Sequence, residues 1–505
     1  MSRLSKNIIY NVLGQGLLLI LGFVAVKYVF SRLGADALGI IYFTTTLSAV
    51  LNAALEMGIG STTVREVSAH FNDEPTYIRD LVRTASLFYW SAYGLLSVLI
   101  YFVAPVLVED WINLRTVSEP AATRMVQILG VGMLSVLPRS LYGSLLRGLQ
   151  RIEFNNLIEL VTIGLQQFGI ILILALGGGL FDVVKWLAAS FVLGLLGYLL
   201  VCRHFLPVRD LLPGFSVSVV RRNLSYSLHM TVNSLISIVH QQCDRVIVSK
   251  LLPIGAFGFY ACASSLVAKS ALVTSAITQA GFPSFSALFH AGDRTGLLSQ
   301  YRKLQDLLCF ATLPVLAAIP FAAMPLFSYL FSPDTARTLL VPTMLLCLGS
   351  YMNGTLNVPY VISLAAGRPD IPVRSNFYAL WVVIPSTVLV IWWFGLVGAG
   401  LSHVLYNLFS YGYAIPRICS QCLAIPTAGW YARVLKILAL ASVTYGAAGM
   451  ILVSGGAHSI LFLTLAYGGG STLFLIGAYW MVGEELRGRL LRSMQVLRTR
   501  MAETL

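Results

Sequence analysis

The sequence predicts an all-α protein that crosses a membrane many times. Of its 505 residues, 57% are hydrophobic and only 11% are charged, and apolar runs of membrane-spanning length recur along the whole chain. Soluble domains carry about 25% charged residues, so this composition excludes an ordinary globular protein. The net charge of +13 then indicates basic cytoplasmic loops rather than a nucleic-acid interface.

A helix that spans a membrane needs about 20 mostly apolar residues. About fourteen segments meet this requirement, and the boundary near GLVGAG, residues 395–400, is the least distinct. The segments are residues 8–30, 38–60, 84–105, 125–146, 154–176, 183–202, 224–249, 256–281, 304–331, 341–366, 376–395, 397–416, 434–454 and 459–482.

The basic residues assign the two sides of the membrane. If the N-terminus is cytoplasmic, 24 of the 34 Lys and Arg residues fall in cytoplasmic segments and six on the opposite side. Because short cytoplasmic loops are enriched in Lys and Arg, we expect both termini in the cytoplasm. The basic stretch ELRGRLLRSMQVLRTR, residues 485–500, is typical of a surface helix near anionic lipid.

Short similarities about 217 residues apart indicate an internal repeat. The pairs are Asn7-Ile-Ile-Tyr10 with Asn223-Leu-Ser-Tyr226, Ser31-Arg32-Leu33 with Ser249-Lys250-Leu251, Leu38-Gly39 with Phe257-Gly258, and Gln150-Arg151 with Gly367-Arg368. We expect two pseudo-symmetric six-helix lobes, residues 1–215 and 216–420, followed by helices 13 and 14 and a basic cytoplasmic tail in residues 421–505. Parallel repeats of this kind place a binding cavity between the lobes. A structural protein or receptor with duplicated helices is the alternative.

Seven charged residues lie at least three residues from either end of a predicted span: Lys27, Glu56, Arg139, Glu159, Asp244, Arg245 and Lys269. Each would cost about 2.5–3.5 kcal/mol at the bilayer centre, so we expect them to face a water-filled cavity or one another. The repeat places Lys27 and Arg245 at equivalent points, and two cations facing one volume favour an anionic substrate. The alternative is that both side chains extend to the headgroups.

Arg139 directly follows Pro138, which predicts a kink in this span. Its side chain is then a gate or phosphate contact, or the buried partner of Glu159 or Glu56. Lys269 is a further candidate for the cationic cavity, although the sequence does not identify its partner. Glu56, Glu159 and Asp244 are candidates for coupling transport to protons or sodium.

Polar stripes accompany these charges. The span at 224–249 carries Tyr226, His229, Asn233, Ser237, His240 and Asp244 within about 80° of one another on a helix. The span at 154–176 carries Asn155, Glu159, Thr162 and Gln166, and the first span carries Asn7, Asn11 and Gln15. Such stripes avoid lipid, so they line a cavity or supply hydrogen bonds between helices.

Catalytic and cofactor chemistry has no signature here. We find no positioned nucleophile and base, no H-E-x-x-H motif and no phosphate-binding G-x-x-x-x-G-K-[ST] loop. CSQC at 419–422 lacks the second ligand pair that a structural zinc site requires. We therefore expect no catalytic residues, no metal and no cofactor.

Three stretches carry a family resemblance: NIIYNVLGQGLLLILGFVAVKYVFSRLGADALGIIYF (7–43), YGSLLRGLQRIEFNNLIELV (142–161) and DRVIVSKLLPIGAFGFYACASSL (244–266). The chain resembles the polysaccharide-repeat (O-antigen or exopolysaccharide) flippases. Their superfamily also contains the multidrug and toxin extruders (MATE) and the lipid II flippase. Lys27 and Arg245 match this family's cations in helices 1 and 7.

The resemblance implies a MATE-like fold with alternating access around a cationic cavity, in the bacterial cytoplasmic (inner) membrane. The implied substrate is an oligosaccharide on polyprenyl pyrophosphate, carried to the outer leaflet, with a polysaccharide polymerase and a chain-length regulator as expected partners. A drug/cation antiporter of the same fold is the alternative. It requires a cavity of carboxylates and aromatics, whereas the seven charged residues named above are four cations and three acids. A non-transporting membrane scaffold is the third interpretation.

Overall fold

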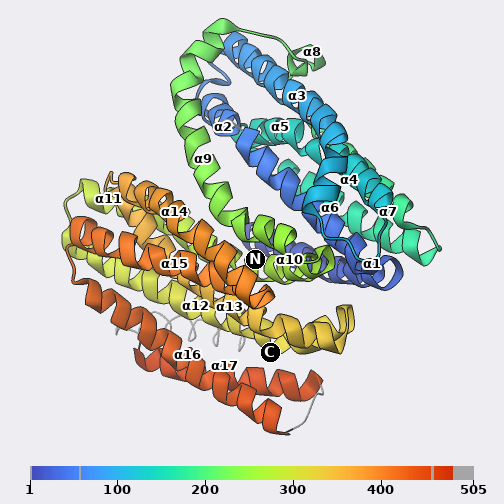
Figure 1. The fold of residues 1–505 in the computed structure, drawn as a ribbon. Helices are drawn as coiled ribbons and strands as arrows, with labels where there is room; N and C mark the ends of the chain where they lie inside the picture. Colours follow the sequence, from blue (N-terminus) through green and yellow to red (C-terminus); the bar gives the residue numbers. More distant parts are fainter. Residues whose placement is uncertain (1–2, 56–57, 456–459, 482–505) are drawn as a thin grey trace, which may run out of the picture. The chain divides into compact units, whose positions relative to one another are not determined.

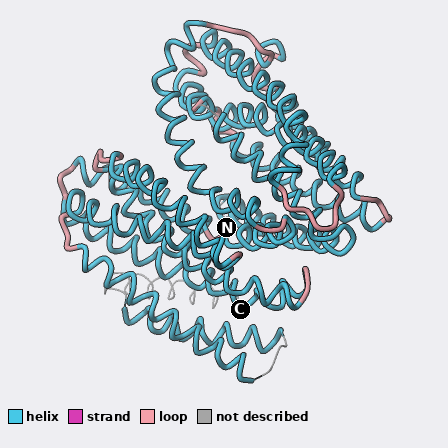
Figure 2. The backbone as a smooth tube through the Cα atoms, in the orientation of Figure 1, coloured by secondary structure: helices cyan, strands magenta, loops and turns pink. Residues whose placement is uncertain are grey.

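The computed structural model describes residues 3–55, 58–455 and 460–481, and these ranges contain helices and loops but no strand (Figures 1 and 2). The helices are α1 (Arg3–Leu55), α2 (Ile59–His70), α3 (Pro75–Val106), α4 (Glu119–Leu134), α5 (Val136–Gly148), α6 (Ile152–Ala175), α7 (Leu180–Cys202), α8 (Val208–Leu211), α9 (Val217–Leu251), α10 (Ile254–Ala268), α11 (Ala271–His290), α12 (Arg294–Leu330), α13 (Pro333–Ala365), α14 (Asp370–Phe394), α15 (Leu396–Ile418), α16 (Thr427–Gly455) and α17 (Ile460–Met481). Short π-helical turns, Leu107–Trp111 and Cys419–Leu423, extend α3 and α15.

The chain forms two compact units. The first comprises Met1–Cys262 with Tyr329–Phe331, and the second comprises Ala263–Ser328 with Ser332–Leu505. The predicted lobe boundary at residue 215 stays a prediction, and the basic stretch 485–500 lies outside the described residues.

Among the described residues, each of the fourteen predicted spans is mostly helical, which confirms the all-α polytopic fold class. Eleven helices within the described ranges are long and apolar enough to cross a membrane. That number counts α1 once, although it contains two predicted spans, and it omits α9 and α15. Exposed apolar side chains such as Leu95, Phe102 and Trp381 suit a lipid environment. The chain is therefore a multi-pass membrane protein, and fourteen spans remain compatible with its helices.

Helix α1 turns at one residue. Gly34 has φ 85° and ψ −180°, and helical backbone flanks it on both sides. Only glycine adopts such a conformation without steric cost. The turn lies between the predicted spans 8–30 and 38–60 and separates them as expected.

The predicted span 125–146 is divided between α4 and α5. Helix α4 ends at Leu134 and α5 begins at Val136. The physical cause is Pro138, because a proline ring clashes with the carbonyl four residues earlier, which here belongs to Leu134. The predicted kink is confirmed, and it sets the direction in which Arg139 leaves the backbone.

A similar break lies within the predicted span 256–281. The structure contains two helices, α10 and α11, and Lys269 lies in the turn between them with an exposed side chain. One candidate span, Ile254–Thr278, nevertheless runs across this turn, and the role of Lys269 in a cavity stays a prediction. The boundary between the predicted spans 376–395 and 397–416 is confirmed, since Gly395, with φ 54°, separates α14 from α15.

One turn recurs in both halves of the sequence. After α5, the amide of Gln150 donates to Arg147 O at 3.0 Å and that of Arg151 to Leu146 O at 2.8 Å. After α13, Gly367 and Arg368 make the corresponding bonds, to Leu364 O at 3.0 Å and to Ser363 O at 2.8 Å. Gln150 and Gly367 both have positive φ, 58° and 69°, as in a Schellman helix end. The two helices therefore end in the same way, as α6 and α11 also do at Gly177 and Gly292, and the internal repeat as a whole stays a prediction.

The core of the first unit surrounds α5. Ten of the thirteen residues of this helix are buried. Its side chains Leu137, Leu141 and Leu145 pack in one apolar cluster with residues of α2, α3 and α7. A helix buried on nearly all sides holds its few polar side chains firmly, and Arg139 is one of them.

Candidate functional site

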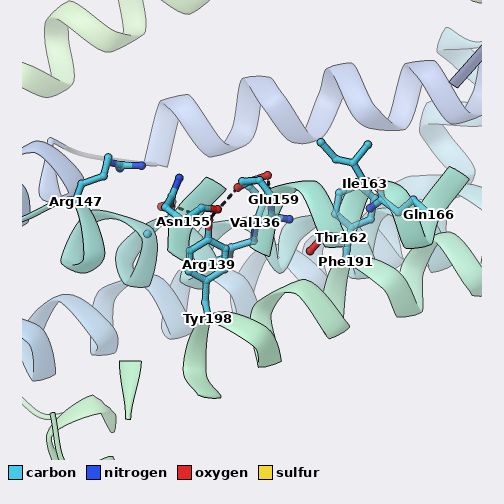
Figure 3. Close-up of a pocket in the computed structure, with 12 residues that line it drawn as sticks. Val136, Arg139, Arg147, Asn155, Glu159, Thr162, Ile163, Gln166, Phe191 and Tyr198 are labelled. Atoms are coloured by element: carbon cyan, nitrogen blue, oxygen red, sulfur yellow. Dashed lines mark hydrogen bonds and ion pairs between the residues drawn. The ribbon is translucent and has the colours of Figure 1, made fainter. Parts of the chain in front are cut away.

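A pocket of about 330 Å³ lies among α5, α6 and α7 in the first unit (Figure 3). Its volume is at the lower end of the range for small-molecule sites. The lining is Val136, Arg139, Ser140, Gly143, Arg147, Asn155, Glu159, Thr162, Ile163, Gln166, Phe191 and Tyr198. This set contains two cations, one carboxylate and several neutral hydrogen-bonding groups.

An ion pair forms the centre of the pocket. The Arg139 guanidinium on α5 pairs through Nη2 with Glu159 Oε2 on α6. Arg139 is 8% exposed, and its guanidinium also lies over the Tyr198 ring, 5.5 Å from the centroid. Of the roles predicted for Arg139, pairing with Glu159 is the one that the structure contains.

Tyr198 connects the ion pair to a neighbouring amide. Its hydroxyl lies 2.8 Å from Asn155 Oδ1 and 3.1 Å from Glu159 Oε1, with the tyrosine as donor in both contacts (Figure 3). A hydroxyl has a single proton, so these two acceptors share it. The Tyr198 hydroxyl therefore links the carboxylate of Glu159 to the Asn155 amide.

The polar stripe predicted on the span 154–176 faces this pocket. All four of its members, Asn155, Glu159, Thr162 and Gln166, line the cavity. Thr162 and Gln166 are buried, so the stripe continues into the interior of the unit. The stripe therefore lines a cavity, which was one of its two predicted roles, but this cavity lies within the first unit and the predicted cavity between the lobes stays a prediction.

A glycine on α7 makes room for the guanidinium. A Cβ added at Gly194 would lie 2.9 Å from Thr162 Cγ2 and 3.2 Å from Arg139 Nη1. A Cβ contact under 3.0 Å is not found in ordinary packing, so any other residue at 194 would require Thr162 to shift. The close approach of α7 to α6 encloses the buried side of the pocket.

Arg147 supplies a second cation at the other end of α5. It is exposed, and its Nη2 donates to Ser144 Oγ at 2.7 Å. With Arg139 and Arg147 positive and Glu159 negative, the lining carries a formal charge of +1. Neutralising Glu159 would raise this charge to +2.

The remaining predicted residues lie elsewhere. Lys27 on α1 has its Nζ 5.1 Å from the Tyr329 ring centroid. Asp244 accepts a hydrogen bond from the Tyr260 hydroxyl at 2.6 Å, and Arg245 and His240 are half-buried on the same helix, α9. The joint action of Lys27 and Arg245 on one substrate stays a prediction.

The structure does not test several further predicted residues. Glu56 and the side chains of Gln15, His229 and Asn233 lie outside the described residues. Lys269 belongs to the second unit. Their proposed roles in a cavity and in ion coupling stay predictions.

Sequence reasoning missed several residues of the pocket, among them Arg147 and Tyr198. Arg147 is one of the basic residues that the positive-inside pattern places in cytoplasmic segments, and it lies on α5 like Arg139. Tyr198 has a visible signal, because it carries the one hydroxyl in the apolar run FVLGLLGYLLV, residues 191–201.

Comparison with known proteins gives consistent relationships. A family model described as "Polysaccharide biosynthesis protein" matches residues 4–289. A Shigella flexneri protein named "Putative O-antigen transporter" is 19% identical over 420 residues, which cover 82% of this chain and 98% of that protein. A Klebsiella pneumoniae protein named "Uncharacterized membrane protein in cps region" is 22% identical over 210 residues, which cover 40% of this chain and 42% of that protein.

Two solved structures share the fold. The lipid II flippase MurJ in an inward closed conformation aligns with a TM-score of 0.69 at 12% sequence identity. The alignment covers 93% of this chain and 97% of the MurJ chain. An inward-facing multidrug resistance MATE family transporter of the MOP superfamily aligns with a TM-score of 0.67 at 12% sequence identity. That alignment covers 80% of this chain and 95% of the transporter chain. These likenesses confirm the predicted MATE-like fold class.

Proposed function

The chain belongs to the polysaccharide biosynthesis protein family, and we propose that it is a flippase for polyprenyl-pyrophosphate-linked oligosaccharide repeat units. In this proposal it moves each unit from the cytoplasmic to the outer leaflet of the bacterial inner membrane by alternating access. The family match over residues 4–289 carries the proposal. The likeness to a protein named as an O-antigen transporter and to the fold of a lipid II flippase supports it.

The pocket among α5, α6 and α7 has chemistry that suits the pyrophosphate. A guanidinium binds phosphate oxygens in a bidentate, charge-assisted manner, and Arg139 and Arg147 both line the cavity. A pyrophosphate that bridges a lipid and a sugar carries two negative charges. The volume of about 330 Å³ accommodates a pyrophosphate or one sugar ring, so the remaining sugars and the polyprenyl chain would lie outside it.

Glu159 provides a means of controlling that interaction. While it is ionised, it occupies the guanidinium of Arg139. Protonation of Glu159, or a sodium ion beside it, would free Arg139 and raise the formal charge of the pocket from +1 to +2. In the proposed cycle this change accompanies pyrophosphate binding, and re-pairing of Arg139 with Glu159 accompanies release.

The membrane potential favours this direction of transport. An inside-negative potential drives anions outward by about 2.3 kcal/mol per charge per 100 mV. Lys27 and Arg245 are proposed to contact the same headgroup from the first and seventh helices, with both chain termini in the cytoplasm. A polysaccharide polymerase and a chain-length regulator are the proposed partners, because the translocated unit must then be polymerised.

The test is a lipid-linked sugar profile of cells that lack the protein. We expect polyprenyl-linked oligosaccharide to accumulate and the surface polymer to disappear, with restoration by the wild type. Arg139→Gln and the double variant Lys27→Gln/Arg245→Gln should each fail to restore it. Arg337→Gln is the matched control, since Arg337 is 74% exposed and pairs only with the exposed Asp334 among the described residues.

A different result would select the antiporter. If the lipid-linked sugars are unchanged and tolerance to cationic drugs falls, the cargo is a small cation and the flippase proposal is wrong. Rescue by Arg139→Gln at the wild-type level, with equal amounts of protein in the membrane, would remove the pocket from the transport path while leaving the flippase function intact.

A further inference from the structure

The second unit contains a larger pocket that the proposed function does not use. Its volume is about 460 Å³, and it lies among the N-terminal half of α12, the segment that leads into α16 and the last residue of α17. Two arginines and two large aromatic residues line it: Arg302, Arg433, Tyr301 and Trp430. The positive-inside pattern assigns this end of α12 and α16 to the cytoplasmic side.

Arg433 is held in a fixed orientation. Its Nε donates to Asp306 Oδ1 at 2.9 Å and its Nη2 to Asp306 Oδ2 at 2.5 Å. The same Nη2 donates to Met481 O at 2.8 Å. These bonds occupy one edge of the guanidinium and leave Nη1 without a partner in the part of the chain that the structure describes. The arginine therefore presents a pre-oriented donor edge.

The formal charge of the pocket is +1. Arg302 and Arg433 contribute two positive charges, and Asp306 contributes one negative charge. Asp306 is buried, and Arg302 is exposed at the pocket wall. A monoanion would neutralise this charge, whereas a dianion would leave an excess negative charge.

Two buried polar atoms in the wall are unpaired. Gln305 Oε1 and Trp430 Nε1 have no hydrogen-bond partner among the described residues, and both side chains are 3% exposed. Gln305 Nε2 donates to Thr355 O at 3.1 Å, which orients the amide. The indole N–H can only donate and the amide oxygen can only accept. A complementary ligand therefore carries both an acceptor and a donor, such as a phosphate oxygen and a hydroxyl.

We propose that this pocket binds a hydroxyl-bearing phosphodiester, supplied as the headgroup of a glycerol-type anionic phospholipid. Arg302 and Arg433 contact the phosphate, Trp430 donates to one of its oxygens, and Gln305 accepts from a glycerol hydroxyl. Basic pockets between membrane helices on the cytoplasmic side bind anionic headgroups in this way. The proposal concerns a bound lipid distinct from the transported substrate, so it does not depend on the flippase function.

The same chemistry is available from a soluble glycerol phosphodiester. The lipid source is favoured because the pocket lies at the predicted level of the cytoplasmic leaflet and is lined by Tyr301 and Trp430. Tyrosine and tryptophan are enriched at membrane–water interfaces. Glycerophosphoglycerol, which is the headgroup without its acyl chains, distinguishes the two sources.

The experiment measures lipid binding to the purified full-length protein in detergent. Dioleoyl-phosphatidylglycerol and dioleoyl-phosphatidylcholine are titrated separately, and bound lipid is counted by native mass spectrometry. We expect one saturable phosphatidylglycerol site and no saturable phosphatidylcholine site. Arg302→Gln and Trp430→Phe should each weaken phosphatidylglycerol binding about tenfold, the effect of losing one charge-assisted hydrogen bond.

The controls separate folding from binding. Arg302 is exposed and Trp430→Phe keeps a ring beside Tyr411, so both variants should elute as the wild type does in size-exclusion chromatography. Arg337→Gln removes an equivalent positive charge from a residue that does not line this pocket. This variant should bind phosphatidylglycerol as tightly as the wild type does. Equal binding by wild type, Arg302→Gln and Trp430→Phe would overturn the site. Equal affinity for glycerophosphoglycerol and for the lipid would overturn the lipid assignment.

Discussion

Gly258 on α10 packs directly against Gly39 on α1. A Cβ added at Gly258 would lie 2.9 Å from both Cα and N of Gly39. The internal repeat predicts these two glycines as counterparts in the two halves of the sequence. The structure shows that both copies of this apolar-Gly pair, Leu38-Gly39 and Phe257-Gly258, contribute to one helix crossing, in which the two backbones touch.

This crossing should not tolerate a methyl group. A Cβ at Gly39 would overlap the carbonyl oxygen of Ile254 and lie 2.6 Å from its carbon. Backbone atoms cannot move aside, so we expect Gly39→Ala to lower stability by about 1–3 kcal/mol, as overpacking does. The melting temperature of the detergent-purified protein measures this. Gly22→Ala, on the same helix with no atom within 4 Å, should melt at or above the wild type. Equal melting of the two variants would contradict the close crossing.

A second steric prediction concerns the pocket. We expect Gly194→Ala to push Thr162 and the Arg139 guanidinium apart, because the new methyl would lie 2.9–3.2 Å from them. Stability should fall by about 1–3 kcal/mol, and transport should fall with it. Gly197→Ala is the matched control, since its Cβ would meet only Ile158 Cγ2 at 3.4 Å. If both variants complement a deletion strain equally, the guanidinium does not need its present position.

The two members of the central ion pair should respond differently to neutralisation. The Arg139 side chain is 10% exposed and that of Glu159 is 42% exposed. Glu159→Gln leaves a buried guanidinium without a counter-charge, and we expect a loss of about 1–3 kcal/mol. Arg139→Gln leaves a carboxylate that water reaches, so we expect a loss of less than about 1 kcal/mol.

The double variant tests whether these effects are coupled. Arg139→Gln/Glu159→Gln should be more stable than Glu159→Gln alone, because no unpaired charge remains. Melting temperatures of the four proteins form a double-mutant cycle, which isolates the interaction energy of the pair. Additive losses would show that the ion pair does not contribute to stability.

Much of the fold could be predicted from the sequence because single residues determine its breaks. Pro138 divides α4 from α5, and Gly34 and Gly395 each permit a turn that other residues disfavour. Lys269 could not be placed in this way. The run around it is apolar on both sides, and hydropathy alone does not distinguish one span from two helices joined by a turn.

The candidate site was only partly predictable. Helical periodicity placed Asn155, Glu159, Thr162 and Gln166 on one face, and that face does line a pocket. Periodicity within one helix does not identify the partner helix. For this reason the pairing of Arg139 with Glu159 remained one of several alternatives, and the contribution of Tyr198 from α7 was not recognised.

The start of α9 is attached to the corner between α2 and α3 by a charged contact. Arg222 Nη1 donates to Glu74 Oε2 at 2.9 Å, and its guanidinium lies 4.0 Å from the centroid of the Tyr77 ring. Glu66 Oε2 lies 3.7 Å from Arg222 Nη2, and His70 Nε2 lies 3.4 Å from the same nitrogen. The hydrogen bond from Arg222 holds the pKa of Glu74 below its ordinary value of 4.5.

This contact should make stability depend on pH. A carboxyl group whose pKa is lower in the folded state stabilises that state above its unfolded pKa, and the contribution is lost as pH falls through the folded pKa. We therefore expect the melting-temperature difference between wild type and Arg222→Gln to be constant above about pH 5 and to shrink below about pH 4. This melting-temperature difference reflects the contacts of Arg222 with all its acidic partners, since the variant removes those contacts together.

Arg221→Gln is the control for this measurement. Arg221 precedes Arg222 on the same helix and is exposed, so its replacement changes the net charge equally without removing the contact to Glu74. We expect its melting temperature to follow that of the wild type at every pH. If the melting-temperature difference between wild type and Arg222→Gln persists unchanged to pH 3.5, packing on Tyr77, rather than the ion pair, attaches α9. Glu74→Gln should then match the wild type in the same range.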